Sequence, residues 1–300
     1  MFLLLAAALI CGASLLTSCK KNPTAGIAMI AKNGQSDYWR QVESAFQNAC
    51  KEKGLDAYYY ATTAGNAYEE QIAAVESIRM LDSKKLKGII FAPIYGMDGE
   101  SAEAEVAALA RERGIPVIII ESPVKTNSPL AERPYFGTDN TAAGKALANK
   151  VPVDRMVAFT RTDNPSIERA EAFQTLKPNA VIYPVNDQVV NVVQALLNDY
   201  DDFVFFNGKD LMDVLRILKA AGKNVYTFDV YGEFLDELIA GNAYFKGIMT
   251  QNNFLMTRKA VDAVLDNATQ GDMVPTFYIT KDNLDDPIVL PFMEFYGKRK

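Results

Sequence analysis

The chain of 300 residues contains no histidine. Without histidine, a Ser-His-Asp triad, a Cys-His pair and any zinc site that uses histidine are excluded. Cysteine is scarce as well, since Cys11, Cys19 and Cys50 are the only three, and no internal disulfide is expected from them. Catalysis by carboxylate or lysine side chains is the enzyme chemistry that stays open.

Other absences narrow the function further. The sequence has no GxxxxGK[ST] phosphate-loop signature, and no GxGxxG follows the first expected strand, so two common nucleotide-binding fingerprints are missing. Acidic residues outnumber basic ones by 37 to 31, which gives a formal net charge of −6. Because nucleic-acid binding uses a positively charged face, this balance argues against a nucleic-acid partner. No histidine or cysteine cluster indicates a metal site, and no cofactor is expected.

Residues 1–18 carry no charged side chain. Their apolar run is too short to span a membrane and has the length of a signal-peptide core. The run ends at Leu16-Thr17-Ser18-Cys19, which resembles the bacterial lipoprotein signal. The resemblance implies a signal peptide over 1–18, lipidation of Cys19 and a lipid-anchored tether over 19–24. The alternative is a plain signal peptide that is cleaved elsewhere.

Short β-rich runs alternate with amphipathic helical runs along the rest of the chain. Two runs, Gly88–Pro93 and Val117–Ile120, are apolar on both faces, which is typical of a parallel sheet covered by helices on both sides. The pattern repeats in the second half, and a chain of this length usually divides into two domains. We therefore predict an α/β fold of two doubly wound parallel-sheet lobes. In the tail we expect β-like pieces at Thr276–Thr280 and Ile288–Phe292.

Several segments occur in an order and spacing that together carry a family resemblance. They are Ser36-Asp37-Tyr38-Trp39, Gly88–Pro93, Phe136–Asn140, Glu168–Phe173, Tyr226–Asp229 and Met249–Asn253. Over nearly the whole chain beyond the leader, the sequence resembles the ribose- and galactose-binding family of periplasmic binding proteins. This type I, Rossmann-like fold is shared with the ligand domains of lactose-repressor-like regulators.

The resemblance implies a hinge of three segments between the lobes, near Thr138-Asp139, Gln251-Asn252 and Thr280. One lobe would comprise residues 25–138 plus 252–279, and the other residues 139–251 plus 280–300. It also implies an extracytoplasmic, monomeric protein that captures a solute without chemistry on it and passes it to the permease of an ABC importer.

Three positions depart from the family pattern. The usual acidic-Arg pair is Glu121-Ser122 here, the usual Asn-Asp pair is found as Asn207-Gly208-Lys209, and residues 161–165 replace a glycine-rich turn. Ribose or galactose is therefore not transferred as the ligand.

Candidate ligand-binding residues lie where the predicted strands end, because ligands bind at the carboxyl ends of strands in such sheets. Aromatic rings cover the faces of a sugar, for which Tyr38 and Trp39 are candidates, and Arg169 offers a fork of donors for two hydroxyls. Each residue also has a structural alternative, such as core packing for Trp39 or helix capping for Asp229. The full set is Asn33, Asp37, Tyr38, Trp39, Pro93, Glu121, Arg169, Asn207, Phe228, Asp229 and Gln251.

These observations predict a solute-binding lipoprotein for a small polar ligand. A monosaccharide or sugar derivative is the favoured ligand. A ligand-sensing receptor for a membrane kinase or chemoreceptor is the main alternative. Nucleosides, autoinducers and sugar acids are alternative ligands, and a carboxylate-based enzyme is a less favoured function.

Overall fold

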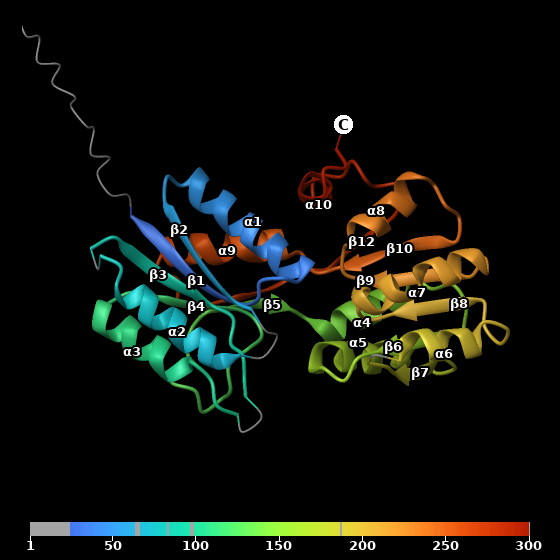
Figure 1. Ribbon diagram of the computed structural model, residues 1–300, viewed down its shortest axis with the longest axis horizontal. Helices are drawn as coiled ribbons and strands as arrows, with labels where there is room; N and C mark the ends of the chain where they lie inside the picture. Colours follow the sequence, from blue (N-terminus) through green and yellow to red (C-terminus); the bar gives the residue numbers. More distant parts are fainter. Residues whose placement is uncertain (1–24, 64–66, 83, 97–98, 187, 300) are drawn as a thin grey trace, which may run out of the picture.

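A computed structural model describes residues 25–63, 67–82, 84–96, 99–186 and 188–299. The predicted signal peptide over 1–18, Cys19 and the tether over 19–24 lie outside the described residues. Two lobes, each a six-stranded sheet with helices on both faces, lie side by side (Figure 1). The prediction of two doubly wound α/β lobes is confirmed.

The N-terminal lobe holds a fully parallel sheet in the order β11-β5-β4-β3-β1-β2. Its strands are β1 (Gly26–Asn33), β2 (Asp56–Thr62), β3 (Leu86–Phe91), β4 (Val117–Glu121), β5 (Tyr135–Thr138) and β11 (Asp272–Val274). Its helices are α1 (Asp37–Glu52), α2 (Tyr68–Arg79), α3 (Glu103–Arg113) and α9 (Asn253–Leu265).

The C-terminal lobe repeats this order as β12-β10-β9-β8-β6-β7, with β12 antiparallel to its neighbour. Its strands are β6 (Val157–Thr160), β7 (Val181–Pro184), β8 (Asp202–Phe205), β9 (Asn224–Phe228), β10 (Phe245–Thr250) and β12 (Phe277–Ile279). Its helices are α4 (Asn140–Ala148), α5 (Asn164–Leu176), α6 (Val189–Leu196), α7 (Gly208–Ala220), α8 (Gly232–Ile239) and α10 (Leu290–Phe295).

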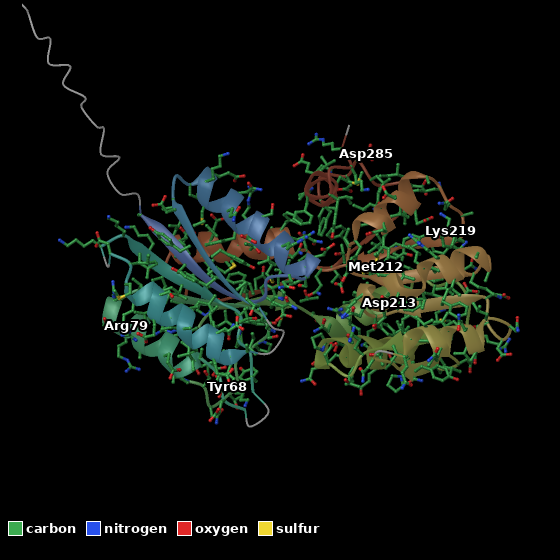
Figure 2. All side chains as sticks on the ribbon, in the orientation of Figure 1. Tyr68, Arg79, Met212, Asp213, Lys219 and Asp285 are labelled. Atoms are coloured by element: carbon green, nitrogen blue, oxygen red, sulfur yellow. The ribbon has the colours of Figure 1, made fainter. Side chains whose placement is uncertain are left out.

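Alternation along the central strands explains why both faces of each sheet are covered. In β4, Ile118 and Ile120 pack with α1 and α9, whereas Val117 and Ile119 pack with α2 and α3. Each fully buried side chain of this size contributes about 1.5–3 kcal/mol to stability. Many charged side chains lie on the outer helix surfaces, where Arg79 and Lys219 are examples (Figure 2). No helix in the described part of the chain is both long and apolar enough to cross a membrane.

The tail differs from the prediction in three ways. The segment Ile288–Phe292 was expected to be β-like, but helix α10 forms there, because Val289, Phe292 and Met293 recur at helical spacing and pack on the C-terminal lobe. The chain already changes sheets between β11 and β12, whereas the third crossing was predicted near Thr280. Strand β11 was not predicted, since it has three residues and only Val274 is buried.

Candidate functional site

A cleft of about 500 Å³ lies between the lobes, where strands of both sheets end. Parallel strands all end at the same edge of a sheet, and the loops that lead to the next helices begin there. Side chains from several loops therefore converge on this edge. Seven of the predicted residues line the cleft: Asn33, Tyr38, Glu121, Arg169, Asn207, Asp229 and Gln251.

On the N-terminal side, the carboxylate of Glu121 is held by two neighbours. Lys32 forms an ion pair with it, Ser122 Oγ donates to its Oε2 at 2.5 Å, and Lys32 Nζ also donates to Ser122 Oγ at 2.7 Å. Burial raises the pKa of Glu121, but the Lys32 charge and the two hydrogen bonds outweigh burial and hold the pKa below its usual value. Glu121 is therefore a charged acceptor at neutral pH.

On the C-terminal side, Asp229 has a different environment. Gln251 Nε2 donates to its Oδ1 at 3.2 Å. Burial raises the pKa of Asp229, and the nearby Arg169 charge opposes this only in part. A carboxyl group in this position gains from a hydrogen-bonding ligand, because Arg169 and the hydrogen bonds from Gln251 and Gly208 offset its burial only in part.

Glu121 and Asp229 share an unusual backbone conformation. Their φ angles are 67° and 62°, in the left-handed region that side chains other than glycine seldom occupy. Glu121 is the last residue of β4 and Asp229 follows β9, and these two strands take the same position in the two sheets. The two lobes thus present one strained carboxylate each to the same cleft, and strain of this kind costs about 1–3 kcal/mol and concentrates at binding sites.

Arg169 is 3% exposed and is held by neutral groups. Its Nε donates to Asn140 Oδ1 at 2.9 Å, one Nη donates to the carbonyl oxygen of Phe206 at 3.2 Å, and the guanidinium lies 4.5 Å above the Phe228 ring. These contacts lock the plane of the guanidinium, so it is preorganised for a ligand.

Tyr38 reaches the cleft with its hydroxyl oxygen buried and without a hydrogen-bond partner among the described residues. Burial, with the carboxylates of Glu121 and Asp229 nearby, raises the pKa of Tyr38. A buried hydroxyl without a partner costs free energy until something bonds to it. The sequence predicted a stacking ring at this residue, and the structure adds a buried hydroxyl that a ligand could bond to.

Three amide side chains have structural contacts in addition to their place in the cleft. Asn33 Oδ1 accepts from the Gln35 backbone, and Asn207 Oδ1 caps α7 by accepting from the Lys209 backbone, both at 2.9 Å. Gln251 joins Asp229 to the first crossing, because its Oε1 accepts from Thr138 Oγ1 at 3.1 Å. Gln251 thereby connects the hinge to the cleft.

Four of the predicted residues do not line the cleft. Trp39 is 5% exposed and packs in the core beneath α1, and Pro93 is buried. Asp37 pairs with Arg40 at 3.0 Å. Phe228 is buried below the Arg169 guanidinium and supports it from behind.

Several cleft residues were missed as candidates. Lys32, Arg161, Ser166 and Tyr231 line the cleft. Lys32 and Arg161 stand at the carboxyl ends of β1 and β6, which take the same position in the two sheets, so the strand-end rule could have found them. Nothing in the sequence singles out Ser166 from other serines in a first helical turn.

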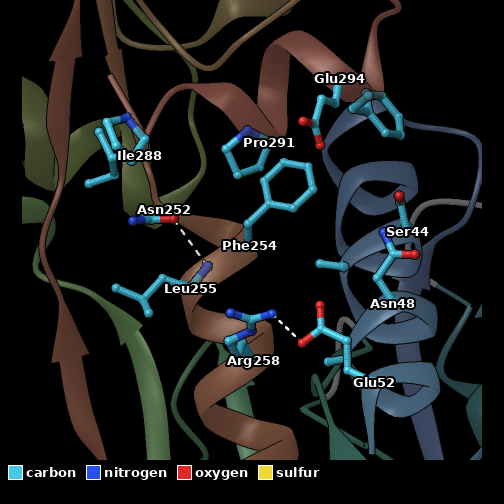
Figure 3. A pocket seen from close by; sticks show the side chains of 14 residues that line it. Ser44, Asn48, Glu52, Asn252, Phe254, Leu255, Arg258, Ile288, Pro291 and Glu294 are labelled. Atoms are coloured by element: carbon cyan, nitrogen blue, oxygen red, sulfur yellow. Dashed lines mark hydrogen bonds and ion pairs between the residues drawn. The ribbon is translucent and has the colours of Figure 1, made fainter. Parts of the chain in front are cut away.

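A second cavity, of about 510 Å³, lies between α1, α9 and the C-terminal segment (Figure 3). Its polar groups are largely paired within the protein: Arg258 with Glu52, and Asn252 Oδ1 with the Leu255 backbone at 3.1 Å. None of the buried side-chain atoms without a partner belongs to its lining, judged over the described residues. The interlobe cleft is therefore the better candidate site. No group of metal-ligating side chains occurs among the described residues.

Comparison with solved structures gives matches over almost the whole chain. An ABC transporter solute-binding protein from Agrobacterium vitis with bound D-fucose has 21% identity and a TM-score of 0.70, covering 89% of this chain and 99% of that one. A carbohydrate transporter solute-binding protein from Agrobacterium radiobacter in complex with D-arabinose has 18% identity, a TM-score of 0.69 and coverage of 89% and 98%. A 5-methylthioribose transporter protein from Thermotoga lettingae has 16% identity, a TM-score of 0.70 and 92% coverage of both chains.

No curated protein matches the sequence. A family model described as periplasmic binding protein domain matches residues 27–272. Proteins of this family bind substrates rather than convert them, and they work outside the cytoplasm. With well over half of the sequence matched and the two-lobed fold in place, the chain belongs to the periplasmic binding protein domain family.

Proposed function

We propose that the protein captures a monosaccharide or sugar derivative between its lobes and delivers it to an ABC importer. The cleft carries the proposal. It places one strained carboxylate from each lobe, a locked arginine and an unpartnered tyrosine hydroxyl around a single space of about 500 Å³. Structural relatives were solved with D-fucose and D-arabinose bound, which supports a sugar-like ligand.

The chemistry of the cleft suits a ring of hydroxyls. Arg169 can donate to two neighbouring hydroxyls, while Glu121 and Asp229 can each accept from hydroxyls of the same ligand. Tyr38 and Tyr231 are the aromatic side chains in the described lining, one from each lobe, and can cover the apolar faces of a sugar. Micromolar affinity needs about −8 kcal/mol, which a few charge-assisted hydrogen bonds and ring contacts can supply.

The experiment is a thermal-shift screen of monosaccharides, sugar acids and nucleosides on residues 20–300. A ligand that binds only the folded form raises Tm. We expect Asp229→Asn and Arg169→Ala to lose the shift seen with the wild type while their circular dichroism stays unchanged. The control, Asp199→Asn, changes an exposed carboxylate of the same lobe and should keep the shift. Full shifts in both cleft variants would refute the site.

We also propose that Cys19 carries a lipid anchor, with 19–24 as tether; the lipoprotein signal motif supports this. The Cys19→Ala variant should leave the membrane fraction in cell fractionation. Retention of that variant in the membrane fraction would contradict the proposal.

A further inference from the structure

The guanidinium of Arg169 touches no carboxylate among the described residues, although the charges of Asp229 and Glu121 act on it from the same cleft. No ion pair of this residue is found within 4.0 Å among the described residues, although it is 3% exposed. Its protein hydrogen-bond partners are an amide oxygen of Asn140 and a backbone oxygen of Phe206, and no described acceptor engages its second Nη. A buried cation that touches no anion is only partly compensated by carboxylates farther away, so the guanidinium favours a negatively charged partner in direct contact.

Ser166 is a second polar group of the cleft that lacks a partner among the described residues. It lies three residues before Arg169 on α5, is 1% exposed and lines the cleft. Its Oγ has no hydrogen-bond partner in the part of the chain that the structure describes. Because residues three apart share a helix face, the hydroxyl and the guanidinium lie on one face of α5. The capping carboxylate of Asp163 accepts from the Ser166 backbone N–H at 3.0 Å and leaves the hydroxyl free.

Not every cationic side chain that lines the cleft forms an ion pair with a carboxylate. Lys32 pairs with Glu121, and Arg161 pairs with Asp210 at 3.1 Å. Lys209, in the first turn of α7, lines the cleft and has no ion pair within the described chain. The described lining holds four cationic and three acidic side chains, whereas the whole sequence carries a net charge of −6.

We propose that the ligand of the cleft carries a carboxylate or phosphate group, held by Arg169, Ser166 and Lys209 of the C-terminal lobe. This proposal rests on the proposed function and specifies the class of sugar derivative. Asp229 lines the same cleft and would repel an anion placed against it. The neutral hydroxyls of the ligand therefore face Asp229 and Glu121, and the anionic end faces the arginine and the lysine.

Isothermal titration with matched pairs of ligands tests the proposal. The pairs are D-galactose with D-galacturonate, and D-ribose with D-ribose 5-phosphate; they distinguish a carboxylate from a phosphate. In at least one pair, the anionic member should bind at least tenfold more tightly, as expected when a neutral hydrogen bond becomes charge-assisted. Its Kd should rise with salt concentration. Equal or tighter binding of the neutral members would overturn the inference and leave the proposed function standing, whereas binding of no member would count against both.

The variants separate ligand contact from folding. Ser166→Ala removes a buried hydroxyl that has no partner, so the ligand-free protein should keep or gain stability, while affinity for the anionic member falls about tenfold. Lys209→Met should lower that affinity about threefold. Lys145→Met removes an exposed lysine of α4 outside the cleft lining and should change neither. Loss of stability in Ser166→Ala without loss of affinity would show that the hydroxyl serves the fold and would contradict its place in the site.

Discussion

Single side chains of the cleft are held in states that cost the free protein stability. The left-handed backbone at Glu121 and Asp229 and the unpartnered hydroxyls of Tyr38 and Ser166 are examples. Such features persist because the surrounding fold imposes them, and a ligand that bonds to the two hydroxyls would recover part of their cost. The residues that destabilise the free lobes are thus the same residues that the proposed ligand would contact.

Asp210 allows a test at this scale. Burial raises the pKa of this carboxyl from 3.8 to about 6, although Arg161 lies 3.1 Å away and pulls it down. Between these pH values the folded protein retains a proton that the unfolded chain loses, so stability falls as pH rises from about 4 to 6. The loss is on the order of 2–3 kcal/mol.

The measurement is urea unfolding of Asp210→Asn and wild type across this pH range. The variant should lack the fall in stability, because its amide does not titrate. Asp199→Asn, which changes an exposed carboxylate of the same lobe, serves as the control and should keep the wild-type slope. An identical slope in Asp210→Asn and wild type would contradict the assignment.

Among the elements, the pairing of α4 with α5 sets the position of Arg169. A Cβ built on Gly144 of α4 would lie 2.2 Å from the carbonyl oxygen of Arg169 on α5. The two helices therefore approach closely at a point where only glycine fits. This contact fixes the backbone of Arg169, and the Phe228 ring supports its guanidinium.

Gly144→Ala should push the helices apart. We expect a destabilisation of about 1–3 kcal/mol, as for overpacked cores, together with weaker ligand binding because the guanidinium moves. Denaturant unfolding and titration with the best sugar of the screen would measure the two effects. Ala142→Ser, on the exposed side of the same helix, should affect neither. Wild-type stability in Gly144→Ala would rule out the close contact.

The elements that the sequence predicted well are those with strong periodicity. Strands such as β3 and β4 are apolar throughout, and helices such as α1 show an apolar stripe, so their pattern survives without tertiary context. Helix α10 was missed because its six residues contain Pro291 and look extended. Strand β11 was missed because three residues are too few to show an alternation of apolar and polar side chains. They form a strand because they pair with β5.

At the scale of the whole molecule, buried polar groups form hydrogen bonds that join the two lobes. Gln41 of α1 donates to the Val230 carbonyl of the other lobe at 3.1 Å and accepts from Asn253 at the second crossing at 2.8 Å. Tyr296, after α10, donates to the same Val230 carbonyl at 2.8 Å and lies 3.1 Å from Asp37 Oδ2. Asp37, predicted to touch the ligand, thus joins the lobes instead.

The cleft could be predicted only in part, because its lining depends on how the helices and the two lobes pack. The strand-end rule locates Glu121 and Asp229, since both follow apolar strands of the predicted sheets. Which side of α1 faces the cleft depends on how the helix packs, so the sequence could not separate Tyr38 from the buried Trp39. Side chains that meet across two lobes, such as Gln41 and Tyr296, are 255 residues apart in the sequence and carry no local signal.

The most direct test of the account is a crystal structure of residues 20–300 with the tightest-binding sugar derivative of the screen. We expect density for the ligand between the lobes, with its polar groups within hydrogen-bond distance of Arg169, Asp229 and the Tyr38 hydroxyl. Density in the cavity between α1, α9 and α10 instead, with the interlobe cleft holding only water, would contradict the account.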